Sequence, residues 1–289
     1  MAKKTGHVAV PFLLTVFIGL IIIGGGAMFA WHYLGIGKEK EPSELVPMTN
    51  GIVTYEDSHT LLFCLDDAED YCPPTFVLMR SNPAKKQLVF VGIPSNSIAI
   101  ADDKQVAVMD DYRSGGAAQA VDFVEKVFDI EVDKYMMMNG DAFKQLCDIC
   151  GGVQYPANAD IAGFNNDGTP QFLNSDQTLT FLTYTMFAGG ESERAFTASS
   201  VVSTMVNQAD GKRLSDMLDN SFNTMINITE SDITSEDYRK RKNAIKYMLE
   251  NGNAIALSIS LDGTVSEEDF ILSSDFISSI KEEYFIDKK

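Results

Sequence analysis

A long uncharged stretch near the N-terminus constrains this chain more than any other feature. No residue from Val8 to Leu34 carries a full charge, and about 20 apolar residues are enough to cross a bilayer. Lys3 and Lys4 precede the stretch, and basic residues beside a membrane span favour the cytoplasmic side. The pattern predicts a cytoplasmic tail over residues 1–7 and a single transmembrane helix over 8–34. The C-terminal remainder would then lie outside the cell membrane.

A cleaved signal peptide is the alternative interpretation of this stretch. The apolar core of a signal peptide usually has about 7–15 residues, fewer than are found here, so a retained anchor is favoured. Trp31 and Tyr33 stand at the far end, where aromatic rings suit the membrane interface. A mixed-charge segment containing a proline follows, and residues 35–58 are therefore expected to form a linker and domain entry.

The charge of the remaining chain is strongly acidic. After residue 37 it contains 41 acidic and 21 basic residues. A surface of this sign repels polyanions. The composition therefore excludes nucleic acid as an expected partner, and it favours a soluble acidic surface over a specific cation store.

Apolar runs and helical periodicities alternate along residues 59–285. Strands are predicted over 59–65, 75–80, 87–93, 134–138, 254–265 and 269–273. Helices are predicted over 115–129, 140–150, 175–187, 192–208, 212–226, 235–251 and 274–285. This alternation is typical of the α/β class. We expect one mixed central sheet with helices on both faces.

The strand over 87–93 indicates where a site would lie. Its near-continuous apolar run is typical of a strand covered on both faces, and Pro94 then ends the strand. Ser95 and Asn96 follow, and open α/β sheets place ligands at the C-terminal ends of their strands. The expected rim is therefore polar but carries no charge at these two positions.

The four cysteines form two close pairs in the sequence, Cys64 with Cys72 and Cys147 with Cys150. Outside the membrane a disulfide is permitted for each pair. Cys147 and Cys150 have redox-motif spacing, but they fall at the end of a predicted helix rather than at its thiolate-stabilising start. A buried pair or a structural disulfide is therefore favoured over a redox centre. A four-cysteine zinc site is only weakly supported by the spacing.

Catalytic motifs are scarce in the extracytoplasmic part. His59 is the only histidine after residue 37, so a multi-histidine zinc site is excluded and a catalytic triad would have to use His59. An apolar strand follows it directly, which favours a strand-edge role. Neither a Walker loop nor a dinucleotide fingerprint occurs. Carboxylates, hydroxyls and a few arginines remain, a set that suits a divalent-metal phosphoryl site.

The middle of the chain resembles the LytR–CpsA–Psr family over roughly residues 59–285. The most specific stretch is AQAVDFVEKVFDIEVDKYMMMNGDAFKQLCDICGGVQYP, residues 118–156. It is similar to the family's helix, its G-I-x-I-D-Y-Y strand entry, its N-F-D-G-F helix start and its G-G-V-x-V-x-x-P exit. LNSDQTLTFL, residues 173–182, resembles L-N-G-E-Q-A-L-A-Y-V.

The resemblance implies a membrane-anchored bacterial protein of the cell envelope. Members transfer glycopolymers from a polyprenyl-pyrophosphate lipid to the cell wall. Their site is a cluster of arginines around the pyrophosphate, with aspartates holding Mg²⁺. Guanidinium forks and a divalent ion suit a ligand with several negative charges.

Most of these site residues are replaced in this chain. Where the family has S-I-P-R-D, Ser95 stands at the arginine and Asn96 at the aspartate. Other charged motif positions fall on uncharged residues, namely Pro74, residues 107–109, Thr183, Thr185 and Thr197. The positions that keep a matching charge are Arg194, Glu191 at an aspartate position, and Asp66 after the first strand. Arg80 and Arg113 lie outside the motifs.

Three interpretations follow from this comparison. The first is a catalytically degenerate binding, scaffold or regulatory protein in cell-wall glycopolymer attachment, that is, a pseudoenzyme with envelope proteins as partners. The alternative is an active phosphotransferase. In it Asp66, Glu191 and Arg194 would hold Mg²⁺ and phosphate, with Ser95, Asn96, Thr183 and Thr185 as neutral donors and Arg80 and Arg113 reaching the site from outside the motifs. The third keeps only the binding of a polyprenyl tail in an apolar pocket.

Overall fold

The structure is a computed structural model that describes residues 53–67, 72–101, 103–251 and 255–287. The predicted transmembrane helix over 8–34 lies outside the described residues. Within the described ranges, no helix combines the length and the apolar character needed to cross a membrane. Residues 52–289 form one compact unit.

The central sheet has six strands in the order β10-β3-β2-β1-β6-β9. Their bounds are β1 His59–Leu65, β2 Thr75–Asn82, β3 Gln87–Ile93, β6 Lys134–Met138, β9 Glu230–Ser231 and β10 Ala256–Ile259. The pairs β1–β6 and β10–β3 are parallel, and the other neighbours are antiparallel. The mixed α/β class is confirmed.

Two smaller sheets accompany the central one. One has the order β11-β12-β4-β5 and the other pairs β7 with β8. Their bounds are β4 Ser97–Ala101, β5 Lys104–Ala107, β7 Val153–Tyr155, β8 Gln171–Leu173, β11 Gly263–Ser266 and β12 Asp269–Leu272. The expectation of one sheet was therefore incomplete. The β4–β5 hairpin escaped prediction because its support comes from β12, far along the chain.

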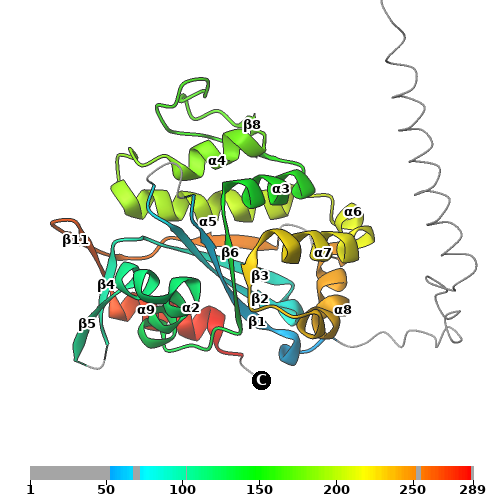
Figure 1. The fold of residues 1–289 in the computed structure, drawn as a ribbon, viewed down its shortest axis with the longest axis horizontal. Helices are drawn as coiled ribbons and strands as arrows, with labels where there is room; N and C mark the ends of the chain where they lie inside the picture. Colours follow the sequence, from blue (N-terminus) through cyan, green and yellow to red (C-terminus); the bar gives the residue numbers. More distant parts are fainter. Residues whose placement is uncertain (1–52, 68–71, 102, 252–254, 288–289) are drawn as a thin grey trace, which may run out of the picture. The chain divides into compact units, whose positions relative to one another are not determined.

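Helices cover both faces of the central sheet, as predicted (Figure 1). On one face lie α2 Val108–Phe128 and α9 Ser274–Ile280, and on the other α3 Gly140–Cys150, α4 Ser175–Thr183 and α5 Gly190–Gln208. The remaining helices of the described ranges are α6 Gly211–Asp216, α7 Leu218–Ile228 and α8 Ser235–Asn251, with short helical turns η1 Tyr55–Asp57, η2 Pro83–Lys85 and η3 Lys281–Phe285.

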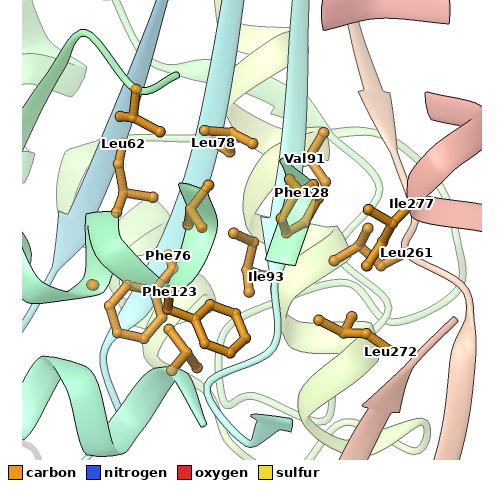
Figure 2. Close-up of a cluster of buried hydrophobic side chains, with 14 of the residues drawn as sticks. Leu62, Phe76, Leu78, Val91, Ile93, Phe123, Phe128, Leu261, Leu272 and Ile277 are labelled. Carbon is orange, nitrogen blue, oxygen red and sulfur yellow. The ribbon is translucent and has the colours of Figure 1, made fainter. Parts of the chain in front are cut away.

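Alternation along the strands divides the core into two clusters. On β1, Leu62 packs into the cluster under α2 and α9, whereas Leu65 packs into the cluster under α3 and α5. Figure 2 shows the first cluster, in which Phe123 of α2 and Ile277 of α9 meet side chains of the strands. Because both faces are covered, the central strands are apolar at nearly every position.

Several helix boundaries differ from the prediction. Helix α2 begins at Val108 rather than at 115 and is interrupted at Gly115 and Gly116, the latter with φ of 67°. The predicted helix over 212–226 is divided into α6 and α7 at Met217. Helix α4 ends at Thr183 rather than at 187.

Candidate functional site

A cavity of about 330 Å³ lies on the face of the sheet that α3 and α5 cover. From the sheet it is lined by His59, Leu61, Phe63, Leu65, Thr75, Val77, Met79, Leu88, Phe90, Lys134, Met136 and Met138. Every second residue of four strands therefore faces it. The covering helices contribute further apolar side chains, including Phe143, Ala198, Val202, Met205 and Phe222. Its volume falls in the range of ligand pockets, and its methionines allow the wall to adapt to a bound chain.

The pocket extends along β1 from His59 to Leu65. Seven strand residues at the usual rise make this about 20 Å. Thr75, which pairs with Leu65 across the strands, marks one end together with Leu182. His59 marks the other. The Thr75 end is the one nearer the rim at Pro94, because Phe76 pairs with Ile93.

Arg194 lies beside the Thr75 end and is fully occupied by internal partners. Its side chain is only 1% exposed. Nε and Nη2 donate to the two carboxylate oxygens of Glu191 at 2.7 and 2.5 Å. The remaining donors reach Thr75 Oγ1 at 2.6 Å and the carbonyl oxygens of Pro74 and Leu182 at 3.1 and 3.3 Å. All five guanidinium N–H groups are accounted for.

Glu191 neutralises the charge of Arg194 and also accepts a hydrogen bond from the rim that follows Pro94. Its Oε1 accepts a hydrogen bond from the backbone N–H of Ser95 at 3.1 Å. The structure therefore brings Arg194, Glu191 and Ser95 together. The sequence also allowed Arg194 to be a surface residue paired with an acid; the pair exists, but it is buried. A pyrophosphate at this rim would meet a compensated arginine rather than an available positive charge.

The other predicted rim residues are held by local contacts. The Asn96 side-chain amide donates to the Glu268 carbonyl oxygen at 2.5 Å. Thr183 donates back to the Leu179 carbonyl of its own helix at 3.0 Å, and Thr185 is exposed beyond that helix. The structure gives none of the three a contact with Arg194.

Arg80 does not join the rim. It lies on β2 opposite Thr60, toward the far end from Thr75 and on the sheet face turned away from the pocket. Its guanidinium donates to Thr60 Oγ1 at 3.0 Å and to Asp287 at 2.6 Å. Arg113 is exposed on α2. Neither converges with Arg194 on the pocket.

The expected magnesium site does not fit the described residues. The Asp66 carboxylate accepts a hydrogen bond from the Tyr112 hydroxyl at 2.5 Å, and burial together with this carboxylate raises the pKa of Tyr112. Across the described ranges, no group of three or more His, Cys, Asp or Glu side chains is placed to hold a metal ion. Divalent ions in phosphoryl sites need converging oxygen ligands, and the described residues do not supply such a set.

Cys64, Cys147 and Cys150 are thiols within the packed fold. Cys64, Cys147 and Cys150 are not in disulfides, so neither of the two bridges that the sequence left open is formed. The Cys72 thiol donates to the Pro73 carbonyl oxygen at 3.3 Å. Burial raises the pKa of Cys147 to about 12 and that of Cys150 to about 11. Both thiols are therefore mainly protonated at neutral pH, and the thiolate is the reactive form of cysteine.

The sequence did not point to the His59 end of the pocket as a site. There Arg241 of α8 contacts Asp133 at 3.2 Å, and Lys134 contacts Asp237 at 3.2 Å. His59 is 8% exposed, and burial together with Arg241 lowers its pKa to about 4. The only sequence signal for this site was the position of His59, a polar residue directly before an apolar strand. The fold is what places Arg241 of α8 at the same end of the pocket.

The sequence and fold match those of a known family. A model of the LytR_cpsA_psr family matches residues 69–281, and the chain belongs to this family. The family predicted from the motifs is therefore confirmed.

Individual relatives are distant in sequence. One is the polyisoprenyl-teichoic acid–peptidoglycan teichoic acid transferase TagU of Bacillus licheniformis, 26% identical over 57% of each chain. The TagU of Halalkalibacterium halodurans is 33% identical over 27% of each chain. The chain thus spans 27–59% of the length of the TagU relatives that it matches.

Solved structures share the fold at low identity. A putative transcription regulator from Eubacterium siraeum has a TM-score of 0.70 at 18% identity, covering 80% of this chain and 93% of that one. TagT bound to LI-WTA has a TM-score of 0.62 at 18% identity, covering 79% and 90%.

Proposed function

We propose that this protein is a membrane-anchored, extracytoplasmic member of the family that binds a lipid chain without transferring a glycopolymer. It would act as a binding, scaffold or regulatory protein in cell-wall glycopolymer attachment. The relatives named for teichoic acid transfer support the envelope context.

One contrast carries this proposal. The apolar pocket has a volume of about 330 Å³. By contrast, every guanidinium N–H of Arg194, which lies beside the pocket, donates to a group within the protein. A truncated charged contact typically costs about 1.5–3 kcal/mol. Several such contacts are missing here, because neutral residues stand where the family motifs have charged ones, namely Ser95, Asn96, Thr183 and Thr185. The chain would therefore keep affinity for the lipid tail and lose affinity for its pyrophosphate.

A transfer assay tests the proposal. Residues 52–289 are incubated with Mg²⁺, a polyprenyl-pyrophosphate-linked glycan and a peptidoglycan fragment as the acceptor, and release of polyprenyl phosphate is followed, with an active transferase of the family as the positive control. We expect no release above the buffer background. Release that EDTA and Glu191→Ala both abolish would establish the active-phosphotransferase alternative instead.

A binding assay tests the lipid part separately. Val202→Phe places a ring in the pocket, and Arg239→Gln on an exposed face of α8 serves as the matched control. Lipid carried through purification, measured by mass spectrometry of an organic extract, should fall in the first variant and stay unchanged in the second. Equal lipid content in both would contradict binding in this pocket.

A further inference from the structure

The two ends of the pocket differ in how many hydrogen-bond donors remain available. At the Thr75 end, Arg194 has every donor occupied. At the His59 end, the only side-chain partner that the described structure gives Arg241 is Asp133, at 3.2 Å. Its Nε is buried and makes no hydrogen bond there. A buried donor without a partner costs about 1–3 kcal/mol, so an acceptor supplied by a ligand would be stabilised at this position.

His59 reinforces this end of the pocket. Its side chain lines the cavity and is more than nine-tenths buried. One ring nitrogen lies 3.4 Å from the Asp57 carbonyl oxygen, and the structure gives the other ring nitrogen no hydrogen bond within the described ranges. The neutral ring adds a second polar group to Arg241 without adding charge.

The charges at this end limit the head group to a single negative charge. Arg241 lies 3.2 Å from Asp133, and Lys134 lies 3.2 Å from Asp237 and 3.9 Å from Asp232. A head group with several negative charges would meet these three carboxylates without a surplus of cations. A single carboxylate can share the guanidinium with Asp133, because the planar fork of arginine offers paired donors to such groups.

We propose that the His59–Arg241 end binds the head group of a single-chain lipid carboxylate, whose hydrocarbon chain runs along β1 and β2 toward Thr75. The pocket length of about 20 Å exceeds the roughly 15 Å that one leaflet of hydrocarbon occupies, so a whole acyl chain fits inside. This inference rests on the lipid binding proposed above, but it assigns the opposite end of the pocket to the head group.

Photo-crosslinking reports the orientation without any substitution. Residues 52–289 are loaded with two palmitate probes, one with a diazirine near the carboxyl group and one with a diazirine near the terminal methyl. We expect the first to label peptides containing His59 or Arg241 and the second to label peptides containing Thr75 or Leu182. The reverse pattern, or identical patterns from both probes, would overturn the inference.

Affinity supplies an independent measurement. Arg241→Gln should raise the Kd for palmitate at least tenfold and leave the Kd for hexadecanol within about twofold, because the alcohol has no charge to pair. Arg239→Gln, an exposed arginine on the same helix paired with Glu236, should change neither. Equal palmitate affinity in Arg241→Gln and the unmodified protein would refute the carboxylate site.

The outcomes separate this inference from the proposed function. If undecaprenyl phosphate binds in a way that Val202→Phe blocks, while palmitate does not bind, the pocket still holds lipid and only the carboxylate site is wrong. If neither lipid binds, the lipid-binding function itself fails and the inference fails with it.

Discussion

Arg194 and Glu191 form a two-point ion pair at the start of α5, with Nε and Nη2 each donating to a different carboxylate oxygen. The same guanidinium reaches Thr75 at the start of β2 and the carbonyl oxygen of Leu182 at the end of α4. The pair therefore joins three elements. In this chain it is a structural connection rather than a ligand site.

Removing this arginine should destabilise the fold. Arg194→Ala leaves Glu191 partly buried without its partner, and breaking a buried pair typically costs about 3–5 kcal/mol. Urea unfolding of residues 52–289 measures the change. Arg239→Ala removes an exposed pair with Glu236 and should cost less than about 1 kcal/mol. Equal costs for the two variants would contradict the structural role of Arg194.

Gly92 of β3 allows the backbone of α5 to approach the sheet. A Cβ added at Gly92 would lie 1.9 Å from the carbonyl oxygen of Ala195, and backbone atoms cannot give way as side chains do. Gly92→Ala should therefore lower stability by at least about 1–3 kcal/mol. At Gly189 an added Cβ meets only the side chain of Glu193, so Gly189→Ala is the matched control. Thermal melting of both variants tests this prediction. An unchanged melting temperature for Gly92→Ala would show that the backbones of β3 and α5 lie farther apart at Gly92 than the structure has them.

His59 should make stability depend on pH. Its pKa falls from 6.5 in the unfolded chain to about 4 in the fold, so the unfolded state binds more protons between these values. Its contribution is complete above about pH 6.5 and is lost as the pH falls toward 4. Between pH 7 and pH 5 the free energy of unfolding should decrease by about 2 kcal/mol.

The control for this prediction is His59→Gln. No other histidine occurs in residues 52–289, and carboxylates with ordinary pKa values stay largely ionised above pH 5. Urea unfolding of the variant should therefore be nearly flat between pH 7 and pH 5. A slope as steep as that of the unmodified protein would assign the effect to another group.

Cys147 and Cys150 should react slowly with thiol reagents. Their raised pKa values of about 12 and about 11 leave little thiolate at pH 7.5, and both side chains line the covered pocket. Mass spectrometry after iodoacetamide treatment should find both unmodified in the folded protein and both alkylated in guanidinium chloride. Rapid labelling in the folded protein would show that this wall of the pocket opens.

Local pattern in the sequence predicted much of the fold. The strand over 59–65, the short strand over 134–138 and the helix over 140–150 coincide with β1, β6 and α3. Asn139 caps α3 by accepting from the Ala142 N–H at 2.9 Å. These features depend on neighbours within a few residues, so the sequence determines them directly.

The functional character of the site was decided by tertiary structure. Arg194 matches a family motif, but its partner Thr75 lies 119 residues away, and only that contact shows that its donors are occupied. Arg80 is near the motifs in sequence, yet strand alternation turns it to the face opposite the pocket. His59 and Arg241 are far apart in the sequence, and only the fold places both at one end of the pocket. Hydrogen bonding and charge balance depend on groups brought together through space, and no local pattern in the chain records them.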